Sequence, residues 1–440
     1  MKFTILILLV LVALPFNAQT TADPALLAEI SKIKAIDNHA HPVKLTVAGE
    51  KPDDEYDALP LEAIEAFPLP QRLQLNNPEF IGAWRDMYGY NYADMTDAHV
   101  NELLAAKDRI RRERGDGYPG WILDQLNIET MFANRVAMGR GLDFSHFRWV
   151  SFIDALIFPL SNETAKRSNP DYRGFYPGEE KLLKRYLSDL KLNALPQSLP
   201  EYLKQVVTPI LESQKRAGAI AVKFEAAYLR KLDFDEADEA RAQTTYQRFV
   251  KGGEPAAADY KNLQDFLFRY VAREAGKLGL AIHIHAIDGA GGYYRASGSN
   301  PLLLESVFND PSLRKTNFVI IHGGAPFTRH TVSMMGKPNV YADFSAQTFF
   351  LYPRALSENL RYWLETYPDR ILFGTDAFSF GPAVDWGEVA WLSNTTARQA
   401  LALALTGMMN DGEITRSRAL ELARMVLHDN AAKLYGLDKK

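Results

Sequence analysis

Eight short apolar segments, most of them separated by stretches with helical spacing, constrain the fold of this chain more than any other feature. Strands that alternate with helices pair in parallel, and eight of them match a closed (β/α)8 barrel. An open doubly wound sheet is the competing fold, but it usually brings a glycine-rich phosphate loop after its first strand, and none follows here. We therefore predict an α/β TIM barrel with strands in residues 35–41, 128–135, 148–157, 219–228, 280–286, 317–324, 340–345 and 371–377.

The alternation is interrupted between the first and second segments. Residues 43–124 begin with acidic, proline and aromatic residues and continue with apolar positions at three- and four-residue spacing. Because barrels of about 250 residues or more fold as one domain, we interpret 43–124 as a helical insertion in a single domain spanning 23–440. Aromatic residues of the insertion could cover the barrel mouth, although packing within the inserted helices is the default: Trp84, Tyr88, Tyr90 and Tyr92.

Residues 1–22 have the pattern of a signal peptide. Lys2 precedes an apolar run from Ile5 to Leu14, and small residues follow at Ala18 and Ala22. A run of this length is too short to span a bilayer comfortably, so we expect cleavage near Ala18 or Ala22. The mature protein is then periplasmic or secreted, without stable membrane association. An uncleaved membrane anchor is the alternative.

The composition limits the partners of the mature protein. A net charge of −4 gives no basic surface for nucleic acid, and 47% hydrophobic residues are ample for a large core. The chain has no cysteine, so neither lipoprotein attachment nor disulfides are available, and stability must come from core packing. A small-molecule substrate is the expected partner, and a homo-oligomer is left open.

Polar side chains lie near the carboxyl ends of the predicted strands, where barrel enzymes place their chemistry. His39 and His41 are two positions apart, so in an extended strand both imidazoles face one side and can reach one point. Five of the nine histidines lie at such strand ends. The full set is His39, His41, Lys223, Glu225, His283, His285, His322 and Asp376.

Each of these residues has an ordinary structural explanation when it is taken alone. Lys223 could pair with Glu225, His322 could cap the turn before Gly323, and Asp376 could cap the following helix. Together, these explanations require independent coincidences at five strand ends. The joint pattern therefore favours a functional site.

Nitrogen and carboxylate ligands suit zinc, manganese or iron better than calcium, which prefers oxygen. In an open site such a metal lowers the pKa of its water toward neutrality and polarises a substrate carbonyl. Asp376 is the natural group to accept the proton of that water, because a carboxylate beside the metal can switch between base and acid during one cycle.

The order of these residues resembles the metal-dependent amidohydrolase superfamily over nearly the whole mature chain. The segments LFGTDA, VYADFS and VIIHGGAPF look like the branch that includes metal-dependent decarboxylases and the domain fused to some glutamine synthetase-like proteins. The closing segment HDNAAKLYGL is similar to that of the family. The insertion after the first strand is similar to that last group and, more loosely, to uronate isomerases.

The resemblance implies a set of metal ligands. His39, His41 and Asp376 would hold a first divalent metal, with zinc as the first candidate. On the fifth strand the role goes to His285, since His283 would lie one layer deeper. His322 would be either a ligand of a second metal or an electrophile on the substrate carbonyl, which places it with Asp376 among the catalytic candidates.

The fourth strand leaves the metal count open, at one or two ions. In binuclear relatives a carboxylated lysine or a glutamate bridges two metals, and Lys223 and Glu225 share one strand face. Lys223 is the first candidate and Glu225 the second, while a plain ion pair between them is the alternative. Mononuclear members lack the bridge.

The remaining candidates are weaker. Glu225 and Arg295 are the candidates for substrate contact. Arg295 could bind a substrate carboxylate, because a guanidinium binds carboxylates in a bidentate manner. A solvated Arg295 on a flexible surface loop is the alternative. The other histidines are expected to pack in the core or lie on the surface: His99, His146, His330 and His428.

Three functions are compatible with these residues. The main hypothesis is an exported hydrolase of an amide-type C–N bond, in which metal-bound hydroxide is the nucleophile and Asp376 shuttles the proton. A decarboxylase or a sugar-acid isomerase on the same barrel is the second, and its products would distinguish it. A non-catalytic binding protein is the third; it predicts loss of the ligand residues, all of which are present.

Overall fold

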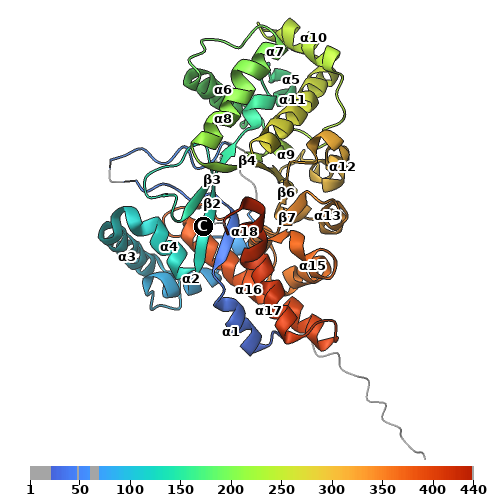
Figure 1. Cartoon of the computed structure of the whole chain (residues 1–440). Coiled ribbons are helices and arrows are strands. Elements are labelled where there is room, and N and C mark those ends of the chain that lie inside the picture. The colour runs from blue at the N-terminus through green and yellow to red at the C-terminus, as the bar shows by residue number, and fades with distance from the viewer. Residues whose placement is uncertain (1–20, 47–48, 60–68, 439–440) are drawn as a thin grey trace, which may run out of the picture.

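The computed structural model describes residues 21–46, 49–59 and 69–438. The predicted signal peptide lies outside these residues, apart from positions 21 and 22. Eight parallel strands form one sheet in the order β1 to β8, and each pairs with the next along the chain (Figure 1). The predicted TIM barrel is confirmed, with strands β1 Ala35–Ala40, β2 Ile128–Arg135, β3 Phe147–Phe152, β4 Ala219–Phe224, β5 Ala281–His285, β6 Phe318–Ile321, β7 Val340–Asp343 and β8 Ile371–Leu372.

Backbone hydrogen bonds between β1 and the segment after β8 close the barrel. The amide of Asp376 donates to the carbonyl of His39 at 2.7 Å, and the amide of His41 donates to the carbonyl of Ala377 at 2.7 Å. The buried carboxylate of Asp37 strengthens this junction by accepting from the amide and the hydroxyl of Thr375. The closure therefore places the side chains of β1 beside that of Asp376.

Four of the predicted strands were too long by three or more residues at their carboxyl ends. The chain leaves β3 for a 3-10 turn at Asp154–Ile157, leaves β4 just before Glu225, leaves β6 at Ile321 and ends β8 at Leu372. At such a point a side chain takes the place of a strand-to-strand hydrogen bond: the carboxylate of Asp154 accepts from the amide of Glu225 at 2.8 Å. Glu225 and Asp376 thus lie in the turns that follow their strands, whereas Lys223 and His285 lie within strands.

The described part of the segment between β1 and β2 contains the helices α2 Glu79–Tyr88, α3 Asp97–Arg114 and α4 Tyr118–Gln125. Figure 1 shows them on one side of the barrel, and they pack toward α16, Trp386–Asn410. The ammonium of Lys107 donates to the Glu388 carboxylate at 2.5 Å, and both side chains are buried. These contacts fix α3 against the helix that follows β8.

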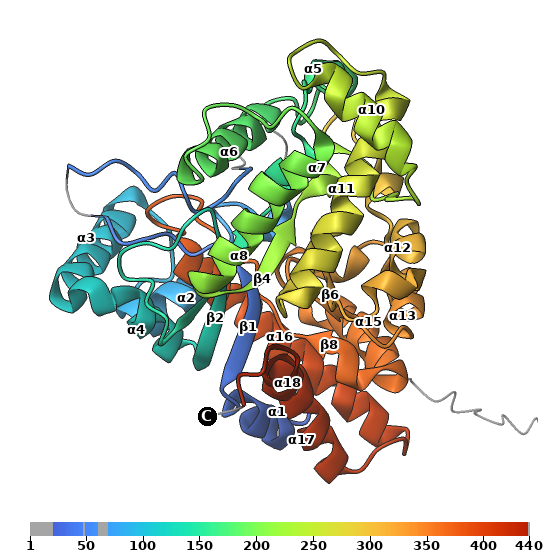
Figure 2. The same cartoon turned by 45° about the horizontal axis from the view of Figure 1, so that its top comes forward.

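The other helices surround the barrel, and α5, α6, α7 and α10 gather beyond one end of it, far from α17 (Figures 1 and 2). They are α1 Pro24–Ser31, α5 Glu163–Ser168, α6 Tyr176–Asp189, α7 Leu199–Tyr202, α8 Thr208–Arg216, α9 Ala226–Leu229, α10 Glu239–Phe249, α11 Ala257–Lys277, α12 Glu305–Asn309, α13 Thr328–Met335, α14 Gln347–Phe350, α15 Pro353–Thr366, α17 Arg416–Arg424 and α18 Asn430–Tyr435. Within the described parts of the chain, no helix has both the length and the apolarity needed to cross a membrane.

Apolar side chains fill the amino-terminal end of the barrel. Ile36, Phe132 and Val150 form one cluster there with residues from the other strands, and α18 packs against them. Tyr435 of α18 donates to the side-chain carbonyl of Asn38 at 2.7 Å. The barrel is therefore closed at this end and can admit a ligand only from the opposite one.

Candidate metal centre

Three ligand atoms converge at the junction of β1 and β8. Oδ1 of Asp376 lies 3.1 Å from Nε2 of His39 and 3.5 Å from Nε2 of His41. Zinc binds such atoms at about 2.0–2.2 Å, which places tetrahedral ligand atoms about 3.4 Å from one another. The chemistry and the spacing of this donor set therefore fit a divalent metal, and the three residues are a candidate metal-binding cluster.

The local backbone explains why these side chains meet. His39 is in β1 and His41 follows it by two residues, so both imidazoles face the barrel interior. Asp376 adopts a left-handed conformation, with φ at 53°, while its amide is bonded to the carbonyl of His39. A non-glycine residue with this φ is uncommon, and such strain is concentrated at functional sites.

His39 and His41 lie in opposite electrostatic environments. Burial and the nearby Lys223 ammonium hold the pKa of His39 well below its ordinary value, so its imidazole is neutral and keeps a lone pair. Burial lowers the pKa of His41, but the carboxylates of Asp57 and Asp376 outweigh that effect and raise it to about 10. Burial also raises the pKa of Asp376. Positive charge on His41 is therefore stabilised between two carboxyl groups.

The residues of β4 form a pair beside this cluster. Nζ of Lys223 lies 3.5 Å from Oε1 of Glu225 and 3.4 Å from Nε2 of His39, and all three side chains are buried. Oε2 of Glu225 has no hydrogen-bond partner among the described residues, and burial raises the pKa of this carboxyl. The structure therefore shows Lys223 and Glu225 as an ion pair. A role for either residue as a bridge between two metals stays a prediction.

His285 and His322 form a second pair. Nδ1 of His285 lies 3.2 Å from Nε2 of His322, and Nδ1 of His322 lies 2.9 Å from Oγ of Ser345. Because Ser345 donates its own proton to Asp343 at 2.7 Å, its oxygen is left to accept from the Nδ1 proton of His322. Nε2 of His322 then carries the lone pair, and it faces His285.

The turn after β6 requires glycine. His322, Gly323 and Gly324 all have φ between 59° and 67°. A Cβ atom on Gly323 would lie 2.2 Å from the ring of Trp363, so the buried tryptophan or the turn itself would have to move. The HGG turn therefore positions His322, which lines the cavity described below.

His283 has a different environment from the other site histidines. Its Nε2 lies 2.6 Å from the hydroxyl of Tyr435, on the closed side of the barrel, and it is opposite Lys223 in the strand register. Burial, followed by the Lys223 charge, lowers its pKa to about 3. It does not line the cavity described below, whereas His285 does.

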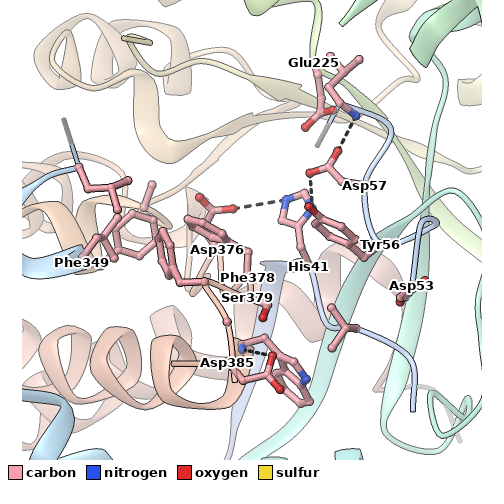
Figure 3. A pocket seen from close by; sticks show the side chains of 18 of the residues that line it. His41, Asp53, Tyr56, Asp57, Glu225, Phe349, Asp376, Phe378, Ser379 and Asp385 are labelled. Atoms are coloured by element: carbon pink, nitrogen blue, oxygen red, sulfur yellow. Dashed lines mark hydrogen bonds and ion pairs between the residues drawn. The ribbon is translucent and has the colours of Figure 1, made fainter. Parts of the chain in front are cut away.

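A cavity of about 1050 Å3 opens above the site. His41, Glu225, His285, His322 and Asp376 lie at its floor, and most of the other lining residues are apolar or aromatic. The walls include Tyr56, Leu59, Leu73, Tyr118, Tyr172, Tyr228, Phe349, Phe350, Phe378, Phe380 and Trp386. Figure 3 shows Phe349 and Phe378 beside Asp376.

Several predicted contacts are not part of this cavity. Arg295 is exposed and does not line it. The four aromatic residues of α2 and the loop after it are not in the lining either; Trp84 and Tyr90, for example, pack on each other with ring centroids 5.2 Å apart. The four remaining histidines have local partners, as His99 has in Asp94 at 2.7 Å.

Other acidic residues near the site were not identified from the sequence. Asp57 lies 3.1 Å from His41, and the only signal for it was an acidic run shortly after the two histidines. Asp154, whose pKa burial raises to about 7, contacts the Glu225 backbone. Both oxygens of buried Glu179 lack hydrogen-bond partners among the described residues, and no sequence pattern pointed to this residue.

A parallel eight-stranded barrel with His, His and Asp at the ends of its first and last strands defines a TIM-barrel protein with a candidate metal site. A family model described as Amidohydrolase matches residues 209–437, more than half of the chain, and the chain belongs to this family. The resemblance seen in the sequence is thereby confirmed.

Known proteins give a consistent picture of the fold. Protein fluG of Emericella nidulans is 31% identical over 145 residues, which are 32% of this chain and 16% of that protein. A crystal structure described as a metal-dependent hydrolase from Lactobacillus casei has a TM-score of 0.60 at 14% identity and covers 96% of this chain and 99% of its own. Glucuronate isomerase from Caulobacter crescentus has a TM-score of 0.58 at 14% identity, with 96% of each chain covered.

Proposed function

We propose that this chain is a metal-dependent hydrolase of an amide-type C–N bond. The observation that carries the proposal is the convergence of Nε2 of His39, Nε2 of His41 and Oδ1 of Asp376 below the cavity. Family membership supports metal-dependent chemistry at this site. The identity of the cleaved bond, an amide-type C–N bond, is our proposal.

A divalent metal held by these three residues would supply Lewis-acid polarisation of the substrate carbonyl and an acidified water. Oδ1 of Asp376 is occupied by the two imidazoles, while its Oδ2 lies 3.9 Å from Nδ1 of His322, and the residue lines the cavity. Oδ2 can therefore accept a proton from the attacking water and return it to the leaving nitrogen. Ser345 fixes the ring orientation of His322, so this histidine can hold the substrate in position.

The cavity walls support a hydrophobic group next to the scissile bond. Aromatic and aliphatic residues dominate the lining, and two of the acidic lining residues are already paired, Asp53 with Arg135 and Asp385 with Arg111. An apolar acyl group or side chain buried here would gain roughly 25 cal/mol per Å2 of surface removed from water. N-acyl amino acids and dipeptides with large apolar side chains are the first substrates to test.

The test is an assay of zinc-loaded protein against such amides, with detection of the new primary amine. The Asp376→Asn variant should lose nearly all activity, since it removes both a ligand charge and the proton acceptor. The matched control is Asp94→Asn, which removes a carboxylate from an exposed His–Asp pair in the inserted segment. If no amide releases an amine while another product class appears, the hydrolase proposal is wrong.

Isomerisation of a sugar acid is the second candidate. The likeness to glucuronate isomerase over 96% of this chain favours it at the level of fold. The predominantly apolar cavity lining argues against a polyhydroxylated substrate, which needs a polar partner for each hydroxyl. Sugar acids and aromatic carboxylic acids belong in the same screen, with a rearranged isomer or carbon dioxide as the discriminating products.

The metal count is tested separately. Elemental mass spectrometry of the wild type and of Lys223→Ala would give two equivalents falling to one or none if Lys223 is a bridge. One equivalent that is unchanged in the variant would show a mononuclear site. Export is part of the proposal and is supported by the first residues of the sequence alone, so the amino-terminal sequence of the protein recovered from its native cells tests it.

A further inference from the structure

Asp57 is supplied by the segment inserted between β1 and β2, and it contacts the candidate metal centre from outside the barrel. Its Oδ2 lies 3.1 Å from Nδ1 of His41, at ion-pair distance, although Nδ1 has no aligned hydrogen bond among the described residues; its Oδ1 accepts from the amide of Leu59 at 2.9 Å. The side chain is only 15% exposed. Figure 3 shows the ring of His41 between Asp57 on one side and Asp376 on the other.

The loop that carries Asp57 is held on two sides. Asp53 accepts from both terminal nitrogens of Arg135, at 2.7 and 3.0 Å, and from the amide of Lys44 at 2.7 Å. On the other side α6 lies close, because a Cβ atom on Gly178 would come within 2.8 Å of the carbonyl oxygen of Ala58. The position of the Asp57 carboxylate is therefore set by the fold.

The chemistry of imidazole decides what this carboxylate can do. A neutral imidazole has one protonated and one unprotonated nitrogen, and only the unprotonated one can bind a metal. Nε2 of His41 is the atom that joins the cluster with Asp376. For Nε2 to present its lone pair, the proton must be on Nδ1, which is the nitrogen beside Asp57.

We propose that Asp57 is a positioning residue, which accepts the Nδ1 proton of His41 in a hydrogen bond and thereby fixes the tautomer and the ring orientation that direct Nε2 to the metal. The inference rests on the metal site of the proposed function. A carboxylate behind a metal-ligating histidine raises the basicity of the ligand and restricts its rotation. The insertion thus supplies an essential part of the centre to a barrel that already holds all three ligands.

A second cation held by His41, Asp57 and Glu225 is the competing explanation, since one ligand atom from each lies within 4.8 Å of the others. That arrangement would use both nitrogens of His41 as ligands at once, which requires an imidazolate. Positive charge is also already provided there, because Nζ of Lys223 lies 3.5 Å from Glu225. The distance thus favours a carboxylate that pairs with the protonated Nδ1 over a carboxylate that binds a metal.

The test measures zinc itself, by chelator competition for the dissociation constant and by the rate of zinc release to excess chelator. Asp57→Ala should bind zinc about 10- to 100-fold more weakly than the wild type, with faster release. Asp57→Asn, which keeps a carbonyl acceptor, should lie between the two. Asp94→Asn is the control and should match the wild type.

Cobalt substitution provides a readout that a purely structural role would not change. The visible spectrum of the cobalt-loaded protein should differ between Asp57→Ala and the wild type, while Asp57→Asn stays close to the wild type. Equal zinc affinity and identical cobalt spectra in all variants would overturn the positioning role. A loss of one whole zinc equivalent in Asp57→Ala at unchanged affinity for the other would overturn it in favour of the second cation. A wild type that binds no zinc would instead refute the proposed metal site itself.

Discussion

At the junction of β1 and β8 the ligand atoms of His39, His41 and Asp376 converge on one point, whereas on the side of β4 to β6 the polar residues form two separate pairs. The first group is joined through the backbone, because the amide of Asp376 is bonded to the carbonyl of His39. In the second group Lys223 balances Glu225 and His285 faces His322, and the contacts are made between side chains.

This difference has a physical cause. Closure of the barrel fixes β1 against the segment after β8, and this brings the three candidate ligand atoms to the spacing of a metal site. The residues of β4 to β6 already satisfy part of their charge and hydrogen-bonding capacity among themselves. A metal at the first place needs little rearrangement, while a second metal would have to displace an ion pair.

The largest expected effect comes from removing His39 from the convergent group, and removing His285 from the other group is the comparison. His39→Ala should weaken zinc binding by more than about 100-fold, beyond the 10- to 100-fold loss typical of outer partners, and should abolish activity. His285→Ala should retain the first zinc equivalent, because its nitrogen is not in the convergent set. Zinc content and affinity of the two variants check this. Equal loss in both would show that the two groups act as one centre.

Breaking the buried pair on the β4 side should affect folding more than first-metal binding. Lys223→Met leaves the carboxylate of Glu225 buried without its counter-ion, which should cost about 3–5 kcal/mol of unfolding free energy. The double variant Lys223→Met, Glu225→Gln should recover much of this loss. Urea unfolding of apo-proteins measures both. Unchanged stability of the single variant would show that Glu225 is protonated in the folded state.

The turn that aims His322 allows a more local test of the same side. Gly323→Ala introduces a Cβ that meets Trp363 at 2.2 Å and forces φ of 59° on a residue with a side chain. We expect a loss of about 1–3 kcal/mol in unfolding free energy. Zinc affinity at the β1–β8 cluster should change little. A large loss of first-metal affinity would instead couple His322 to that cluster.

The smallest effect is a pH dependence on the β1 side. Burial opposes ionisation of Asp53, but Arg135 and the surrounding hydrogen bonds outweigh it and lower the pKa of this carboxyl below its ordinary value. A folded-state pKa below the unfolded one stabilises the protein above the unfolded pKa of about 3.9, and this contribution is lost as the pH falls through the folded-state pKa.

The ion pair that Asp53 forms with Arg135, which anchors the loop carrying Asp57, should therefore weaken only as the pH falls below the ordinary carboxyl pKa. Unfolding free energy measured from pH 6 down to pH 3 should decline less steeply in Asp53→Asn than in the wild type, although the variant starts from a lower stability because Arg135 remains buried. Parallel curves for the two proteins would contradict this assignment.

The sequence carried most of the information about the barrel itself. Apolar runs and a two-residue spacing are local patterns, so residues 35–41 and 280–286 could be assigned to strands, and their polar ends to one rim. The predicted ends of β3, β4 and β8 were wrong because side chains such as Asp154 and Asp37 capture backbone amides there, and that depends on residues distant in the chain.

The tertiary structure alone decided how the site is assembled. Which residue meets Nδ1 of His41 depends on the path of the loop from Pro52 to Leu59, which Arg135 and α6 fix from outside. The separation of His283 from His285 likewise follows from Tyr435, which reaches His283 from the far end of the chain. The sequence determined the types of the candidate ligands and their order along the barrel, because these follow from local periodicity. The structure determined their partners and charges, because burial and long-range contacts set those.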